Sequence, residues 1–238
     1  RSLIAEHGHE IAGIIVEPLQ RLIPPVPGFL EGLREECDKA GIVLIFDEVV
    51  TGYRLAYGGA QERYGVTPDL CTLGKIVGGG FPLAAIAGRA DILAHFDKAK
   101  VGAEGFLMQL GTLSGNPVAA VAGLKTMEIL RRPGAYERLT HVGETLMATF
   151  REALDEAGIA HRVVGDPVLF DVVFTDRDVR NYRDIHGADM ERNIRFNALL
   201  REKGIFKPIG KTYPSLAITD ADLEQTADAI RYAAKNLT

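Results

Sequence analysis

The stretch Val43-Leu-Ile-Phe-Asp-Glu-Val-Val-Thr-Gly52 contains a short apolar run that ends at two acidic residues. A run of this length, rich in β-branched and aromatic residues and followed by a glycine, predicts a buried strand over Val43 to Phe46. Asp47 then stands at the carboxyl end of the strand, and Glu48 points to the opposite face if the strand continues. A buried carboxylate is costly to leave unpaired, so Asp47 requires a cationic or hydrogen-bonding partner.

A second stretch, Asp69-Leu-Cys-Thr-Leu-Gly-Lys-Ile-Val-Gly-Gly-Gly80, places a lysine just beyond another short apolar run. Leu70 to Leu73 is a predicted strand, and the glycines around Lys75 let the backbone approach a bulky planar ligand without a Cβ in the way. A phosphate loop is disfavoured because Ile76 occupies the position where that motif has Ser or Thr. The glycine triplet also lacks the spacing of a dinucleotide-binding fingerprint.

Other short apolar runs alternate with helical patterns in the first half of the chain. Ile11 to Val16 predicts a fully buried strand, and Phe29 to Ala40 predicts a helix with its apolar residues on one face. This alternation indicates an α/β fold, with a mostly parallel sheet flanked by helices. Because such sheets bind ligands beyond the carboxyl ends of their strands, we expect one rim to carry Glu17, Asp47 and Lys75.

The sequence changes character after a break at Arg132-Pro-Gly134. Helical spacing then predicts helices over Tyr136 to Ala157, Met190 to Lys203 and Ala221 to Leu237. The stretch Val163 to Phe174 is strand-like, with an interruption at Gly165-Asp-Pro167. These elements predict a smaller C-terminal α+β domain. We therefore divide the chain into residues 1–132 and 133–238.

Composition excludes several classes of protein. The 238 residues are 47% hydrophobic and 25% charged, which is typical of a globular protein with one large or two small cores. The net charge of −5 and the scattered Lys and Arg residues give no basic surface for nucleic acid. No apolar segment approaches the roughly 18 residues that a membrane span needs. We therefore expect a soluble protein without a nucleic-acid or membrane partner.

Cysteine and histidine usage adds little chemistry. Cys37 and Cys71 are too few for a disulfide framework and lack metal-ligand spacing, so we expect reduced cysteines and a cytoplasmic location. His7-Gly-His9 has metal-like spacing but lies near the chain end, without further ligands nearby in the sequence, and is interpreted as a solvated terminus. We assign no metal site.

An amine and a carboxylate at the ends of two strands are the pair that pyridoxal 5'-phosphate (PLP) chemistry requires. Lys75 can form a Schiff base with the cofactor aldehyde, and Asp47 beneath the pyridine nitrogen can keep that ring protonated. Plainer interpretations stay open for both residues. Asp47 could cap a helix or pair with Arg54, and most lysines are solvated surface charges.

Four stretches in succession carry a family resemblance: Glu17-Pro-Leu-Gln20, Asp47-Glu-Val-Val-Thr-Gly-Tyr-Arg54, Leu73-Gly-Lys-Ile-Val-Gly-Gly-Gly80 and Gly111-Thr-Leu-Ser-Gly-Asn-Pro117. Together they resemble the class III aminotransferases, which are PLP enzymes of fold type I. The last stretch and Tyr57-Gly-Gly-Ala-Gln61 are most similar to the glutamate-1-semialdehyde aminomutase branch.

The resemblance implies a role for each matching residue around the cofactor ring. Lys75 would form the Schiff base and later move the proton, Asp47 would hold the pyridinium, and Val49 would pack against one face of the ring. Residues 1–132 would then be the C-terminal portion of the PLP-binding large domain. The segment implied to come before Arg1 would carry further parts of the site.

The resemblance also implies a homodimer. Thr112, in the loop that begins at Gly111, would donate its hydroxyl to the cofactor phosphate in the neighbouring subunit. A loop rich in glycine and hydroxyl groups suits a phosphate because N–H and O–H donors stabilise a dianion. Glu17 would act at the substrate side, where it pairs with a movable arginine in transaminases. Many relatives have Gln at the position of Val50. The aminomutase branch, like this chain, lacks that Gln.

The predicted function is PLP-dependent transfer of an amino group between a small amino compound and an oxo acid or aldehyde. One alternative is intramolecular amine migration, as in an aminomutase. Another is a non-catalytic or half-site chain that keeps the fold while another chain supplies the rest of the site. A doubly wound nucleotide- or acyl-binding domain is the third.

Overall fold

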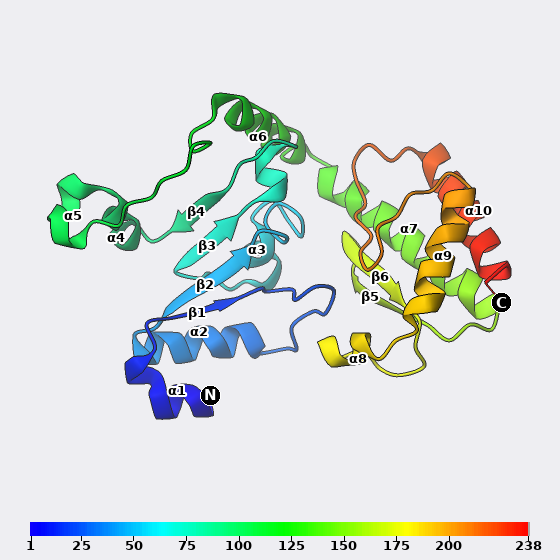
Figure 1. The fold of residues 1–238 in the computed structure, drawn as a ribbon, viewed down its shortest axis with the longest axis horizontal. Helices are drawn as coiled ribbons and strands as arrows, with labels where there is room; N and C mark the ends of the chain where they lie inside the picture. The colour runs from blue at the N-terminus through cyan, green and yellow to red at the C-terminus, as the bar shows by residue number, and fades with distance from the viewer. Residues whose placement is uncertain (238) are drawn as a thin grey trace. The chain divides into compact units, whose positions relative to one another are not determined.

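The computed structural model describes residues 1–237, which form two compact units (Figure 1). The first unit comprises Arg1–Leu19 and Pro25–Arg132. The second comprises Gln20–Pro24 and the chain from Pro133 onward. The short segment Gln20–Pro24 therefore packs with the C-terminal part of the chain, although it follows the first strand directly in sequence.

The first unit is built on a four-stranded sheet with the order β1-β2-β3-β4 (Figure 1). Its strands are β1 (Gly13–Val16), β2 (Val43–Glu48), β3 (Leu70–Leu73) and β4 (Ala85–Gly88). The first three are parallel, and β4 pairs antiparallel with β3. The mostly parallel α/β sheet is thus present as predicted, with three strand ends meeting at one carboxyl rim.

The helices of this unit begin and end where local sequence signals place them. Gly41, in the left-handed region at φ 69°, ends α2, and the Asn116 side chain caps α6, whose first residue is proline. The helical segments are α1 (Ser2–His7), η1 (Gly8–Glu10), α2 (Phe29–Ala40), α3 (Gly59–Tyr64), η2 (Lys75–Gly78), α4 (Ala90–Leu93), η3 (Ala94–Phe96), α5 (Lys98–Gly105) and α6 (Pro117–Leu130).

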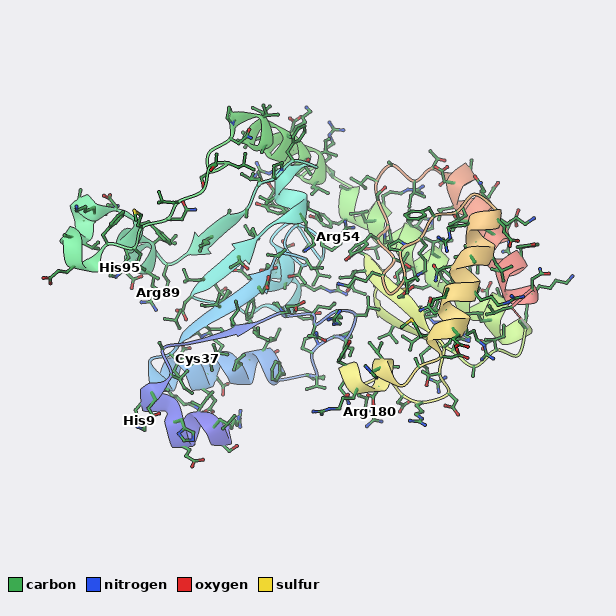
Figure 2. The ribbon with its side chains drawn as sticks, in the orientation of Figure 1. His9, Cys37, Arg54, Arg89, His95 and Arg180 are labelled. Atoms are coloured by element: carbon green, nitrogen blue, oxygen red, sulfur yellow. The ribbon has the colours of Figure 1, made fainter. Side chains whose placement is uncertain are left out.

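The core of the first unit lies between α2 and one face of the sheet. Leu30 and Cys37 of α2 are buried together with Leu44 and Phe46 of β2 (Figure 2 labels Cys37). On the other face Ile15 is 62% exposed. The prediction of a fully buried strand over Ile11 to Val16 is therefore wrong, because β1 is an edge strand with one face uncovered in the described residues.

The second unit packs helices against a β-hairpin. The hairpin pairs β5 (Arg162–Asp166) antiparallel with β6 (Leu169–Val173). The turn between them includes Pro167, the last residue of the predicted interruption. Its core is formed by apolar residues of α7, α9, α10 and β6. The helices are α7 (Ala135–Glu156), α8 (Tyr182–His186), α9 (Met190–Glu202) and α10 (Asp220–Lys235).

Across residues 1–237, no helix is both long enough and apolar enough to cross a bilayer.

Candidate active site

The register of β2 and β3 brings the two candidate chemical groups to the same rim. Asp47 is paired with Thr72, and the next pair is Glu48 with Leu73. Lys75 follows two residues beyond Leu73, so the carboxylate and the amine both belong to the carboxyl ends of adjacent parallel strands. Asp47 lies within β2 instead of just after it, because the strand continues to Glu48.

The half-buried Asp47 carboxylate is held by one of its two oxygens. Its Oδ1 accepts hydrogen bonds from the Val49 amide at 3.1 Å and from the Thr72 hydroxyl at 3.2 Å. Within residues 1–237 it forms no ion pair, and Oδ2 receives no hydrogen bond. The structure therefore does not show the alternative pairing with Arg54. One carboxylate oxygen remains available for a ligand with a positive charge or an N–H group.

Lys75 adopts an unusual backbone conformation. Its φ of 51° lies in the left-handed region, which costs a non-glycine residue roughly 1–2 kcal/mol. Its side chain is exposed and, in the described part of the chain, makes no hydrogen bond or ion pair. Strained backbone of this kind clusters at functional sites, where the surrounding structure imposes it.

Direct packing joins the two motifs. A Cβ built on Gly74 would lie 3.2 Å from Val49 Cγ1, so the Val49 side chain rests on the backbone just before Lys75. A larger residue at position 74 would push Val49 away. The turn after Asp47 and the turn that begins at Lys75 are therefore fitted against each other.

A cavity of about 920 Å³ lies beside these strand ends. Val49, Thr72 and Gly111 all line it, so the loop of residues 111–115 reaches the space next to Asp47. Most of the remaining lining is apolar, from Leu73, Pro82, Leu83, Ala84, Ala85, Ile86, Phe96, Phe106 and Leu113. The cavity therefore suits a ligand with a flat or apolar body and a few polar groups.

The loop of residues 111–116 is a succession of turns that leads into α6. The Ser114 amide donates to the Gly111 carbonyl at 2.9 Å, and the Asn116 amide donates to the Leu113 carbonyl at 3.1 Å. Thr112 is exposed and is not among the residues that line the cavity.

Glu17 also stands apart from the cavity. It directly follows β1 and is half-buried at the same rim, but it does not line the cavity. Of the candidate residues, Val49 and Gly111 line the cavity, whereas Asp47, Lys75, Thr112 and Glu17 are not among its lining residues.

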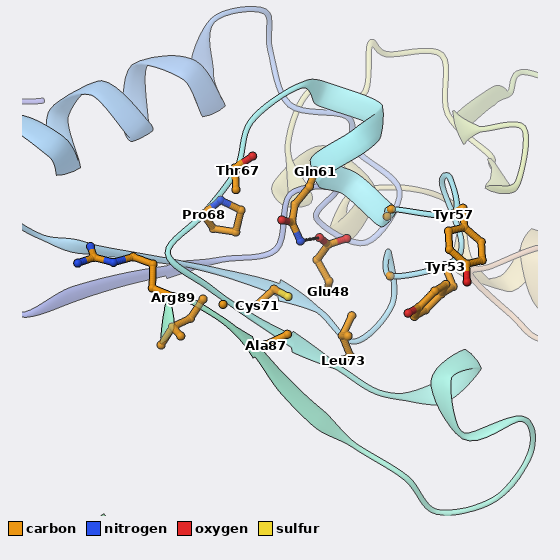
Figure 3. Close-up of a pocket in the computed structure, with 15 residues that line it drawn as sticks. Glu48, Tyr53, Tyr57, Gln61, Thr67, Pro68, Cys71, Leu73, Ala87 and Arg89 are labelled. Carbon is orange, nitrogen blue, oxygen red and sulfur yellow. Dashed lines mark hydrogen bonds between the residues drawn. The ribbon is translucent and has the colours of Figure 1, made fainter. Parts of the chain in front are cut away.

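The sequence reasoning assigned no role to two residues at this rim. Thr72 donates to Asp47, a role that only the strand register reveals. Glu48 is 1% exposed and faces the opposite side of the sheet, as its position beside Asp47 predicts. There it accepts a hydrogen bond from Gln61 at 2.9 Å, beside a second pocket of about 420 Å³ (Figure 3).

Comparison with known proteins agrees with this geometry. The family model "Aminotransferase class-III" matches residues 1–234, and the chain belongs to this family. The class III aminotransferases are PLP-dependent enzymes.

Solved structures support the same assignment. The chain is similar to an omega-transaminase from Sphaerobacter thermophilus, with 38% identity and a TM-score of 0.90 over 99% of this chain and 54% of that chain. It is also similar to a β-phenylalanine aminotransferase from Variovorax paradoxus, with 35% identity and a TM-score of 0.86 over 97% and 53% of the two chains. The chain therefore spans about half the length of these relatives, and the shared fold is that of PLP-dependent transaminases.

Proposed function

We propose that the protein is a PLP-dependent aminotransferase that moves an amino group between a small amino compound and an oxo acid or aldehyde. The observation that carries this proposal is the placement of Asp47 and Lys75 at the carboxyl ends of two adjacent parallel strands. Among residues 1–237, Asp47 Oδ2 and Lys75 Nζ have no partner, as expected of groups that act on a ligand.

The residues present fit PLP. Asp47 Oδ2 is a free anionic acceptor for a ring N–H, Val49 offers an apolar surface for a ring face, and Gly74 leaves the space that Val49 occupies. Lys75 supplies the amine that would hold the cofactor covalently. When bound, PLP supplies an electron-withdrawing ring that stabilises negative charge on the carbon beside the transferred amine.

Different side chains of this chain would then position the cofactor and transfer the proton. Asp47 would keep a proton on the ring nitrogen, because a nearby carboxylate favours the charged form of a base. Thr72 and the Val49 amide would hold Asp47 in place through Oδ1. Lys75 Nζ, once released by the incoming amine, would take up and return the proton at the reacting carbon.

We further propose that the phosphate is bound between subunits of a homodimer. Gly111 borders the cavity, whereas Thr112 is exposed beside it. That arrangement supports a role for Thr112 in the neighbouring site. Glu17, at the same rim, would act on the substrate side. Residues 1–132 would form the C-terminal portion of the PLP-binding domain, and residues 133–238 the small domain.

The cavity lining supports an apolar substrate. Phe96, Phe106 and Leu113 border the space, and no Lys or Arg side chain is among its lining residues. A similar protein acts on β-phenylalanine, as its name states. Aromatic amines and β-amino acids are therefore the first donors to test.

Absorbance of the purified protein with PLP tests this proposal. The lysine-bound cofactor should give a visible band that borohydride removes, and Lys75→Ala should abolish this band. Lys98→Ala, which changes an exposed lysine on α5, is the matched control and should keep it. Unchanged absorbance and borohydride sensitivity in the Lys75→Ala variant would refute the proposal.

Intramolecular amine migration is the second candidate. It is favoured by the likeness of Gly111 to Pro117, and of Tyr57 to Gln61, to the aminomutase branch. Incubation with a single amino substrate and no acceptor separates the two reactions, because only a mutase turns over repeatedly without an added acceptor.

A half-site chain is the third candidate. It would bind PLP only after mixing with a chain that carries the other part of a class III aminotransferase.

A further inference from the structure

Glu48 is a fully buried acid that the proposed chemistry does not use. It is the last residue of β2 and is 1% exposed. Figure 3 shows its carboxylate directed toward Gln61. As neighbours in β2, Glu48 and Asp47 point to opposite faces of the sheet. Burial of a carboxylate is unfavourable unless hydrogen bonds replace its water. Its partners should therefore show what the group does.

Both oxygens of Glu48 accept hydrogen bonds from chain segments that follow β2. Oε2 accepts from the Thr51 hydroxyl at 3.1 Å and from the Ala60 amide at 2.6 Å. Oε1 accepts from the Gln61 amide group at 2.9 Å. Glu48 therefore ties the turn after β2 to the first turn of α3.

The backbone between these contacts is folded closely around Glu48. The Gly52 amide donates to the Glu48 carbonyl at 2.9 Å, and a Cβ on Gly52 would lie 2.8 Å from that same oxygen. Gly59, at φ 68°, has no room for a Cβ against the Glu48 carboxylate. The path of residues 49–61 is thus fitted to this side chain.

The same turn begins with the residue that fixes Asp47. The Val49 amide donates to Asp47 Oδ1, and the Val49 side chain rests on Gly74. The turn of residues 49–52 is consequently held from both faces of the sheet, by Asp47 on one and by Glu48 on the other.

We propose that Glu48 is a positioning residue for the cofactor site. From the far face of the sheet it fixes the turn of residues 49–52, and through the Val49 amide it sets the direction of the Asp47 carboxylate. The proposal rests on the function proposed above, because it assumes that Asp47 binds the ring nitrogen of PLP. Without the Glu48 carboxylate, Val49 and Asp47 would sample several orientations and bind the PLP ring less tightly.

Substitutions at Glu48 should differ in a characteristic way. Glu48→Ala removes both acceptor oxygens, and with them three hydrogen bonds, and should weaken PLP binding by about tenfold or more. Glu48→Gln should retain binding, because its oxygen can face Thr51 and Ala60 while the Gln61 amide rotates to accept its N–H. Thr51→Val removes one donor at nearly constant shape and should give a smaller loss. Glu62→Ala, which loses a hydrogen bond to the Gly58 amide on exposed surface, is the matched control.

Two readouts test the proposal in the purified protein. PLP titration followed by visible absorbance, repeated across pH, should give Glu48→Ala a higher dissociation constant and a ring nitrogen that loses its proton at lower pH. Amide hydrogen exchange without PLP should be faster over residues 49–61 in Glu48→Ala than in Glu62→Ala.

The outcomes separate this inference from the proposed function. If the unsubstituted protein binds PLP and Glu48→Ala binds it with the same affinity and pH profile, Glu48 has no positioning role. Loss of PLP binding in Glu48→Gln equal to that in Glu48→Ala would also overturn the inference. If the unsubstituted protein and its Lys75→Ala variant have the same spectrum with PLP, the proposed function itself fails, and this inference with it.

Discussion

At the scale of single residues, Asp47 carries the most specific expectation. Its carboxylate is oriented by Thr72 and the Val49 amide, so that Oδ2 is left for a ligand. Asp47→Asn keeps the shape but removes the charge that would hold a proton on the ring nitrogen. We expect kcat to fall at least about 100-fold, which is typical when a preorganised electrostatic contact is lost.

Steady-state kinetics and urea unfolding together check this expectation. The midpoint of urea unfolding should change little, because an amide is cheaper to bury than a charge. Thr72→Val, which removes only a donor to Oδ1, should reduce kcat far less. An Asp47→Asn variant that keeps kcat within a few-fold of the unsubstituted protein would show that the carboxylate is not the ring partner.

The sequence predicts residue roles only where a pattern is local. Asp47 and Lys75 stand out because each follows an apolar run, and the structure places both at one rim. The contact between Thr72 and Asp47 depends on register between strands 25 residues apart, and no local pattern encodes it. For Glu48, strand alternation predicts the direction of the side chain. Its hydrogen-bond partners are not predicted, because they depend on how residues 51–61 fold back toward β2.

At the scale of elements, one acid organises the amino end of the sheet. Asp69, at the start of β3, receives the Arg34 guanidinium at 2.9 Å and the Leu44 amide at 2.8 Å on Oδ2. Arg89, which follows β4 and is labelled in Figure 2, donates to Oδ1 at 2.9 Å. Burial tends to raise the pKa of Asp69, but the hydrogen bonds from Leu44, Arg89 and Arg34 outweigh it and hold the pKa below its ordinary value.

The lowered pKa of Asp69 predicts how stability depends on pH. Because the folded-state pKa lies below the unfolded one, the stabilisation is complete above the ordinary value of 3.8 and is lost as pH falls below it. Asp69→Asn should lower the free energy of unfolding by about 1–3 kcal/mol at pH 7. Urea unfolding between pH 7 and pH 3 should show this difference shrinking in the acid range. A difference that stays constant over that range would contradict the assignment.

A matched control comes from the same cluster. Asp91 binds the other side of the Arg89 guanidinium, but its side chain is 64% exposed. Asp91→Asn should therefore change stability only slightly at any pH, because exposed ion pairs contribute little. A loss as large as that of Asp69→Asn would mean that Arg89, and not burial of Asp69, sets the energetics.

Elements with strong local signals are predicted well from the sequence. The residues Phe29–Ala40 form a helix with the predicted bounds, since a glycine lies at each end, Gly28 before it and Gly41 after it. In the second unit, the stretch Val163 to Phe174, which is strand-like with an interruption at Gly165-Asp-Pro167, contains the two strands of the hairpin and the buried acid Asp171. This buried acid pairs with Lys207 at 2.6 Å, a contact across 36 residues that no periodicity reveals.

At the scale of the whole molecule, the exposed apolar residues near the cavity bear on assembly. Leu107, Met108 and Leu110 are 60%, 70% and 79% exposed, and they lead directly into the loop that carries Thr112. Several large apolar side chains exposed in one short segment are typical of an interaction surface. It supports the proposal that Thr112 completes the site of a neighbouring subunit, although the sequence of one chain encodes no pairing between two copies.

Mixing two impaired variants tests whether Thr112 acts across subunits. Lys75→Ala removes the proposed catalytic amine, and Thr112→Ala should weaken phosphate binding enough to lower activity at limiting PLP. If Lys75 and Thr112 of one site come from different subunits, a mixed dimer contains one site with both residues intact and one with neither. Equal amounts exchanged to equilibrium should then regain about one quarter of the native activity, because half of the two-fold symmetric dimers are mixed. If the two residues come from the same subunit, the mixture should show no more than the mean of the separate variants, and a monomer in sedimentation would exclude the arrangement outright.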